Sequence, residues 1–477
     1  MVKNVRKASL PVVGRLHHFT ENEVKVIREK LLCWYDAHHR VLPWRSIAAT
    51  EPDRNKRAYA VWVSEIMLQQ TQVSTVIDYF KKWMTKWPTV GDLASSTLEE
   101  VNQVWAGLGY YSRARRLHEG ALKVVKELNG EFPNDRDSLI HHLPGVGRYS
   151  GSAVSSIALG CAVGVVDGNV SRVLARVRGI GANIAAQSTV EHMWSLADQI
   201  VDPERPGDFN QAMMELGATV CTPKMASCSA CPLRLQCVAY HKSVDEKEKA
   251  SITNHFKNPE KKKQSLEPSG LPDIECLTDC DLCLRKEDWD NSLGVQNYPR
   301  KAQKTQSRQE QSAVVILEHT NGKVLLVQRP KTGLLANLWE FPSIPLTEEM
   351  DHWNEVVTEC LVKEFGVPSS FASSRTFVAD VIHIFSHIRQ TYKVYKILVD
   401  GQEKLTWPTR YQGGQWLTRE EFFTSATSTA MKKVFRAADT CGQKSKNKKN
   451  RMDLEGKSSE KKKQKTISHF FKAVQRK

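Results

Sequence analysis

The sequence predicts a multidomain protein in which an all-α region is followed by an α+β domain. From Glu21 to about residue 240, apolar residues recur every three or four positions, which is the period of amphipathic helices. Trp62, Ile66, Val73 and Phe80 show this spacing. Beyond residue 311, short apolar runs are typical of strands. A chain of 477 residues is also too long for a single hydrophobic core.

Composition sets the expected boundaries. We expect a disordered basic N-terminus over residues 1–20, the helical region over 21–240, an interdomain connector over 241–310, the α+β domain over 311–437 and a disordered basic tail over 438–477. The connector is rich in Lys, Glu, Ser and Pro and poor in apolar residues, so it is not expected to build a core. The basic N-terminus is compatible with an organelle presequence or with a plain disordered start.

The net charge is a weak argument for nucleic-acid binding. The formal net charge is +15, but thirteen basic and three acidic residues lie between Gln443 and Lys477, so about two thirds of it belongs to the tail. The longest uncharged stretch, from Tyr149 to Val166, contains several serines and glycines and predicts a closely packed buried helix rather than a membrane span. We therefore expect no membrane association.

The α+β domain is expected from three strand-like segments. Residues 313–317 and 323–327 are apolar runs separated by Asn321-Gly322, a typical hairpin signal, and residues 392–398 alternate in the same manner.

Two short phrases in the helical region indicate chemistry. In Leu143-Pro144-Gly145-Val146-Gly147, the residues Gly145 and Gly147 suit a tight hairpin that exposes backbone N–H groups and a helix N-terminus to a phosphate. The phrase Val166-Asp167-Gly168-Asn169 then supplies an acid to the same surface. Each phrase alone is also compatible with an ordinary glycine turn or a helix cap. Their succession favours acid or nucleophilic chemistry on DNA.

Two groups of cysteines predict metal centres. Cys221, Cys228, Cys231 and Cys237 lie within seventeen residues and include a single short Cys-x2-Cys pair, which favours a [4Fe–4S] cluster over structural zinc. Cys276, Cys280 and Cys283 in the connector are spaced for zinc but are one ligand short. The alternative for the second group is three unbound thiols.

The motifs together resemble the MutY adenine DNA glycosylases. The resemblance lies in residues 64–73 (SEIMLQQTQV), 107–113 (GLGYYSR), 143–147 (LPGVG) and 166–170 (VDGNV), together with the four-cysteine loop. It covers most of the chain apart from the termini and the connector. It implies a helix-hairpin-helix glycosylase region with an iron–sulfur loop, and excision of adenine mispaired with 8-oxoguanine in double-stranded DNA.

The chemistry of that reaction fits the residues. Cleavage of an N-glycosidic bond needs a proton for the leaving base and a negative charge beside the cationic sugar. By resemblance, Glu65 protonates adenine N7 and later activates water, and Asp167 stabilises the sugar cation or captures it. Asn169 and Tyr149 are expected to orient these groups. An apolar neighbourhood would raise the pKa of Glu65, whereas a solvated helix glutamate is the alternative.

Tyr149 distinguishes this chain from the related endonuclease III enzymes. At that position those enzymes carry a lysine whose amine forms a Schiff base and drives strand cleavage. We therefore expect a monofunctional glycosylase that leaves an abasic site. The alternatives are a glycosylase/lyase of the endonuclease III type and a non-catalytic DNA damage sensor.

Other residues are assigned to DNA contacts. Leu68, Gln70 and Tyr110 match the positions that the family inserts into DNA when the target base leaves the stack. Core packing is the alternative for Leu68 and Tyr110. Three arginines beside Tyr110 suit phosphate contact or a solvated helix face, namely Arg113, Arg115 and Arg116.

The α+β domain resembles a Nudix fold with a broken metal-binding box. The box should fall at residues 359–366, where Cys360 and Lys363 replace two carboxylates, so magnesium-dependent pyrophosphohydrolase activity is disfavoured. Phe385, Ser386 and His387 match the loop by which the family recognises 8-oxoguanine.

The resemblance also implies a further zinc ligand. This ligand is expected to be His17, with His18 as the alternate.

The resemblance implies protein partners as well. Gln464, Ile467, Phe470 and Phe471 match a motif that docks on the sliding clamp, PCNA. The checkpoint clamp and an apurinic endonuclease are further partners of the family. We expect a monomer located in the nucleus, with a mitochondrial fraction as a further expectation.

Overall fold

The computed structural model describes residues 17–255, 280–300, 307–347, 352–385, 388–400 and 405–439. It divides into two compact units, Met1–Thr305 and Gln306–Lys477. Within the described residues, no helix combines the length and the hydropathy that crossing a membrane requires.

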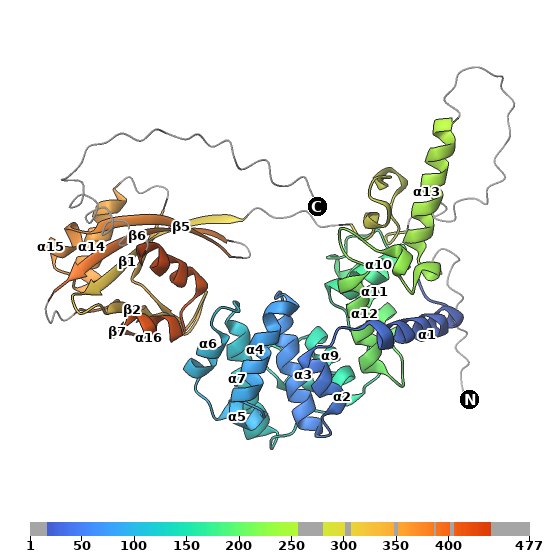
Figure 1. The fold of residues 1–477 in the computed structure, drawn as a ribbon, viewed down its shortest axis with the longest axis horizontal. Coiled ribbons are helices and arrows are strands. Elements are labelled where there is room, and N and C mark those ends of the chain that lie inside the picture. Colours follow the sequence, from blue (N-terminus) through green and yellow to red (C-terminus); the bar gives the residue numbers. More distant parts are fainter. Residues whose placement is uncertain are drawn as a thin grey trace, which may run out of the picture. The chain divides into compact units, whose positions relative to one another are not determined.

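The first unit is helical throughout (Figure 1). Its helices are α1 (Glu21–His38), α2 (Pro43–Thr50), α3 (Arg54–Leu68), α4 (Val73–Lys86), α5 (Val90–Ala94), α6 (Leu98–Trp105), α7 (Ser112–Glu127), α8 (Arg136–His142), α9 (Arg148–Leu159), α10 (Gly168–Val177), α11 (Gln187–Ile200), α12 (Pro206–Thr219) and α13 (Val238–His255). Side-chain caps begin several of them; Thr20, for example, forms a capping box with Glu23 at the start of α1. Trp62, Trp83 and Trp105 are fully buried and supply much of the core.

Helices α8 and α9 form the helix-hairpin-helix. Gly145 in the hairpin has φ +78°, and a Cβ atom there would lie 2.4 Å from Cδ of Arg116, so both the turn and the packing favour glycine. Gly147 is the N-cap residue of α9 and offers no side-chain cap, which leaves the first N–H groups of the helix available to an anion.

The sequence predicted one buried helix from Tyr149 to Val166. The structure does not form a single helix there. Helix α9 ends at Leu159, where Gly160 adopts the left-handed conformation with φ +73°. Residues 160–167 then run without regular structure to Asp167, the N-cap of α10. The glycine overrides the absence of charge, which by itself does not mark where a helix stops.

Two parts of the predicted connector, residues 241–310, have structure that its composition did not indicate. Helix α13 continues to His255, and residues 280–300 pack onto the helical unit. Leu284 and Tyr298 are buried there, and the carbonyl of Tyr298 accepts a hydrogen bond from Nε of Arg176 at 3.0 Å. A few well-placed apolar residues suffice for this packing, although the composition of the segment is polar.

The second unit is a mixed sheet with helices against it. Its strands are β1 (Arg308–His319), β2 (Val324–Gln328), β3 (Trp339–Glu340), β4 (Ser343–Leu346), β5 (Thr376–Ile384), β6 (Ile388–Val399) and β7 (Gly413–Leu417). The order is β3-β2-β1-β6-β5; β4 also pairs with β1, and β7 with β2. Strands β1 and β6 are parallel, and the other pairs are antiparallel.

Helices complete the core of this unit. Helix α14 (Trp353–Phe365) buries Val357, Leu361 and Phe365 against the sheet. Helices α15 (Ser369–Ser373) and α16 (Arg419–Thr424) follow, and residues 429–439 are also helical. The three segments expected as strands lie in β1, β2 and β6, and the turn at Asn321-Gly322 joins β1 to β2.

Candidate active site

One pocket of the first unit contains the predicted acids. It has a volume of about 670 Å³ and opens among α2, α3, α9 and α12 beside the start of α10. Its lining includes the four residues that the sequence assigned to catalysis, Glu65, Tyr149, Asp167 and Asn169. Residues that lie about one hundred positions apart in the chain therefore face one cavity.

The surroundings of Glu65 favour its protonated form. The side chain projects from α3 and is only 4% exposed. Burial raises the pKa of Glu65 to about 7, and the nearby charge of Asp167 acts in the same direction. The phenol of Tyr149 donates a hydrogen bond to Oε2 of Glu65 at 2.5 Å, which partly opposes this shift. A carboxylic acid with this pKa can give a proton near neutral pH.

Asp167 both caps a helix and faces the pocket. Its Oδ1 accepts a hydrogen bond from the backbone N–H of Val170 at 2.7 Å, and its Oδ2 accepts one from Nδ2 of Asn169 at 2.9 Å. Burial raises the pKa of Asp167, and these hydrogen bonds act against that rise. The cap and the pocket position are thus compatible, because one carboxylate serves both.

Arg172 fixes the position of Asn169. Its guanidinium donates to Oδ1 of Asn169 at 2.8 Å, to the carbonyl of Gly217 at 2.7 Å and to the carbonyl of Cys221 at 2.8 Å. One side chain therefore connects the Asp167 segment with the start of the four-cysteine loop.

A second charged group in the pocket was missed from the sequence. Glu215 on α12 is 1% exposed and pairs with Nε of Arg40 at 2.6 Å and with Nη2 of Arg45 at 3.0 Å. Burial opposes ionisation of Glu215, but its two arginine partners outweigh burial and lower its pKa. A lone glutamate in an apolar helix carries no local signal, since its partners lie some 170 residues away.

The residues assigned to DNA insertion lie at the last residue of α3 and in the segments that follow α3 and α6. Leu68 lines the pocket and is half-buried, and Gln70 is exposed with φ +54°. Tyr110 is 44% exposed with φ +47°. The alternative of core packing does not apply to Tyr110, because a core side chain would be covered.

Arg113 is not a phosphate contact. The side chain is buried and directs its guanidinium into the protein, where it donates to backbone carbonyls such as that of Gln69 at 2.7 Å. Arg115 is half-buried beside Glu119 at 3.7 Å, and Arg116 is exposed on the same helix. The alternation of burial along α7 separates three arginines that the sequence could not distinguish.

The four cysteines of the loop converge. Cys221, Cys228, Cys231 and Cys237 line one cavity, which is also bounded by Val173 and Arg176 of α10. Nη1 of Arg176 lies 3.3 Å from Sγ of Cys221.

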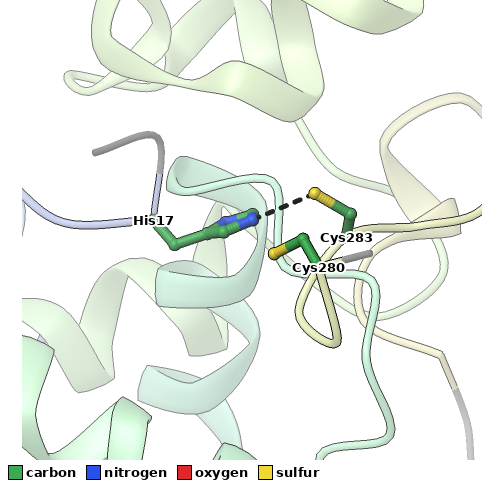
Figure 2. Close-up of side chains that lie close together, drawn as sticks. All are labelled: His17, Cys280 and Cys283. Atoms are coloured by element: carbon green, nitrogen blue, oxygen red, sulfur yellow. Dashed lines mark hydrogen bonds between the residues drawn. The ribbon is translucent and has the colours of Figure 1, made fainter. Parts of the chain in front are cut away.

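His17 lies beside two cysteines of the connector (Figure 2). Its Nε2 is 3.2 Å from Sγ of Cys283, and the ligand atoms of His17, Cys280 and Cys283 all lie within 4.8 Å of one another. Nδ1 of His17 contacts the carbonyl of Arg178 at 3.0 Å, which orients the ring. Cys276 lies outside the described residues. The alternate ligand, His18, instead packs its ring against His192.

The second unit holds the broken Nudix box on α14. Glu359 pairs with Lys363, and Glu364 pairs with Arg410 at 2.8 Å. The remaining carboxylates are thus each neutralised by a basic side chain. Phe385 follows β5, with its ring 4.6 Å from that of His383. Ser386 and His387 lie outside the described residues, as do the tail residues Gln464, Ile467, Phe470 and Phe471.

Comparison with known proteins decides the family. Residues 63–199 match the model of the HhH-GPD superfamily of base excision DNA repair proteins, and residues 313–437 match a NUDIX domain. Over 434 residues the chain is 51% identical to the adenine DNA glycosylase of Homo sapiens, an alignment that covers 89% of this chain and 76% of that protein. The chain belongs to the adenine DNA glycosylase family.

The chain is also similar to a plant relative and to a solved structure. The adenine DNA glycosylase of Arabidopsis thaliana is 40% identical over 434 residues, which cover 82% of this chain and 61% of that protein. A solved structure of the complex between the C-terminal domain of mouse MUTYH and human PCNA is 40% identical, covering 28% of this chain and 89% of that chain with a TM-score of 0.24. The expected order of a helix-hairpin-helix glycosylase region and a Nudix-like domain is confirmed.

Proposed function

We propose that this adenine DNA glycosylase removes adenine opposite 8-oxoguanine by hydrolysis, with Glu65 as general acid and Asp167 as the anion beside the sugar. The observation that carries the proposal is that both carboxyl groups face one pocket, with Tyr149 hydrogen-bonded to Glu65. Protonated Glu65 delivers its proton to N7 of adenine. The C1′–N9 bond then breaks, and its electron pair leaves with the base.

The second half of the reaction uses the same groups. Asp167 stabilises the positive sugar, and the Glu65 carboxylate takes a proton from the water that attacks C1′. The pKa of Glu65 is raised to about 7, which suits the acid, whereas hydrogen bonds from Val170 and Asn169 favour the ionised form of Asp167, which suits the anion. Arg40 and Arg45, which pair with Glu215, also line this pocket and place donors there for the edge of a purine.

The absence of an amine at residue 149 supports a hydrolytic rather than a lyase reaction. A phenol has no amine nitrogen and cannot form a Schiff base. The product is therefore an abasic site with an intact strand.

Single-turnover excision on an adenine:8-oxoguanine duplex tests the proposal. The native protein should release adenine, and Glu65→Gln should not, because glutamine keeps the shape but has no proton to donate. Glu51→Gln, an exchange at the C-cap of α2, serves as the matched control. Intact adenine with the native protein would show a DNA damage sensor instead. Borohydride trapping of a stoichiometric covalent complex would show a lyase of the endonuclease III type.

We further propose that the four-cysteine loop holds a [4Fe–4S] cluster. The four thiols line one cavity together with Val173 and Arg176. Four cysteine thiolates around one site are the ligand set that such a cluster uses. A cluster there would act structurally. Iron and acid-labile sulfide analysis tests this.

The other cysteine group suits zinc. His17, Cys280 and Cys283 supply the nitrogen and sulfur donors that zinc prefers, and Cys276 is the fourth ligand that we propose. Zinc there would join the segment before α1 to the segment after α13.

Recognition of the lesion is assigned to the second unit. We propose that Phe385, Ser386 and His387 contact 8-oxoguanine, and that the C-terminal motif binds the sliding clamp in the nucleus, with a mitochondrial fraction. The neutralised Nudix box disfavours pyrophosphohydrolase activity. Release of pyrophosphate from an oxidised purine nucleoside triphosphate would contradict this.

A further inference from the structure

Two strained chain segments present the residues assigned to DNA insertion. The Gln70 loop (residues 69–71) follows α3, and the Tyr110 loop (residues 107–110) follows α6. Gln70 and Tyr110 are not glycines, yet both adopt left-handed backbone conformations, with φ of +54° and +47°. Such conformations persist in a non-glycine residue only where surrounding contacts hold the backbone. Specific contacts must therefore hold these two loops.

One guanidinium binds both loops. Nη1 of Arg113 donates to the carbonyl of Gln69 at 2.7 Å and to those of the last turn of α3, Ile66 at 2.8 Å and Met67 at 2.9 Å. Nη2 of the same side chain donates to Oγ1 of Thr71 at 3.2 Å and to the carbonyl of Gly109 at 3.1 Å. Arg113 thus contacts the backbone before Gln70, the side chain of Thr71 after it, and the carbonyl of the residue before Tyr110.

The setting of Arg113 differs from that of an ordinary buried arginine. The side chain is 6% exposed, and no carboxylate of the described residues forms an ion pair with it. Burial lowers its pKa to about 10. Its charge is balanced by the carbonyl dipoles at the C-terminal end of α3, where the unpaired carbonyls carry partial negative charge. A buried charge is costly, so this arrangement needs a compensating role.

Aromatic residues of α4 and α6 also hold the Tyr110 loop in place. Nε1 of Trp105 donates to the carbonyl of Gly109 at 2.9 Å, and the guanidinium of Arg113 lies over the rings of Trp105 and Tyr110 at 5.2 and 5.4 Å. The phenol of Tyr79 donates to the carbonyl of Ala106 at 2.8 Å. Arg113 connects this fixed loop to the Gln70 loop.

We propose that Arg113 is a positioning residue that couples the two loops, so that Gln70 and Tyr110 enter the DNA as one unit when adenine leaves the stack. This inference rests on the proposed function of the two loops as DNA-inserting segments. A planar fork of donors can serve carbonyls on two loops at once, whereas the single ammonium group of lysine cannot reproduce that geometry.

A double-mutant cycle between Gln70→Ala and Tyr110→Ala tests the coupling. Both side chains are exposed, so neither change should disturb folding. In the native background, we expect the double variant to lose less single-turnover excision than the product of the two single losses, by at least about threefold. Losses that simply multiply in the native background would overturn the proposal, and this measurement does not require any Arg113 variant to fold.

The same cycle is then repeated in the Arg113→Lys background. We expect the losses to become multiplicative, because the lysine leaves the loops independent. A coupling unchanged by Arg113→Lys would overturn the proposal. Arg54→Lys is the matched control, since Nη2 of Arg54 also binds two backbone carbonyls, those of Phe132 and Pro133 at 3.1 and 3.2 Å, away from both loops. This control should keep the coupling.

A second readout separates positioning from general damage. With adenine already unpaired opposite an abasic site, Arg113→Lys should excise within a few-fold of the native protein, whereas on a paired duplex the loss should be larger. Equal losses on both substrates would contradict the proposal. Native protein that excises no adenine at all would instead contradict the proposed function, so the two failures are distinguishable.

Discussion

The phenolic oxygen of Tyr149 lies 2.5 Å from Oε2 of Glu65, so the first turn of α9 contacts the last part of α3 inside the pocket. The hairpin with Gly145 and Gly147 comes directly before α9, the helix that carries Tyr149. Helix α9 therefore links the hairpin, at its N-terminus, to the proposed proton donor on α3.

The rate of adenine excision should depend on pH. Glu65 must be protonated, and its pKa is raised to about 7, so its proton is present below neutral pH and lost above it. Asp167 must be ionised, and burial raises its pKa, so excision should also fall at acidic pH. We expect a bell-shaped profile of the single-turnover rate that falls about tenfold per pH unit on its alkaline side. A rate that is constant between neutral and alkaline pH would exclude Glu65 as the acid.

Tyr149→Phe should shift that profile. In the native protein, the hydrogen bond from Tyr149 lowers the pKa of Glu65. The substitution removes this bond, so the alkaline limb of the profile should move to higher pH. We expect the rate at neutral pH still to fall by about tenfold or more, because the Glu65 carboxylate that forms as the proton leaves loses a hydrogen bond worth about 1.5–3 kcal/mol, which outweighs the larger protonated fraction. Tyr59→Phe is the control, since Tyr59 donates to the carbonyl of Trp87 away from the pocket. That variant should keep the native pH profile.

Arg172→Met should slow excision while the four thiols remain in place. The substitution removes the donors to Asn169, Gly217 and Cys221 and leaves the Asn169 amide free to turn. We expect a loss of about tenfold in the single-turnover rate, with the iron content unchanged because Arg176 still donates to the carbonyl of Cys221 at 3.3 Å. If the rate stays native, the position of Asn169 does not depend on Arg172.

Cys283→Ser should release zinc and lower stability. A serine hydroxyl is a poor zinc ligand, so metal analysis should fall from roughly one zinc ion per chain towards none, with iron retained. The melting temperature should fall as well, because the ion would join two distant segments. Cys33→Ser changes an exposed thiol on α1 and should alter neither value. Full zinc content in Cys283→Ser would show that this group is not the ligand set.

The sequence predicted the features that require a particular residue type at one fixed position. Gly145 marked the hairpin because few other residues accept its left-handed backbone conformation. The alternative interpretation of Asp167 as a helix cap located the start of α10, because a cap must stand at one fixed position. The strands around Asn321-Gly322 followed for the same reason. Uncharged composition, by contrast, did not locate the end of α9.

By itself, the sequence determined the two domain types, the helix-hairpin-helix and the residues proposed as acids, because each depends on a short pattern of residue types. Only the tertiary structure decided that Arg113 turns inward while Arg116 stays exposed, and that Glu215 meets Arg40 and Arg45. It also decided that residues 280–300 pack on the helical unit. Burial and ion pairing depend on which distant elements come together, and no local pattern of one sequence contains that information.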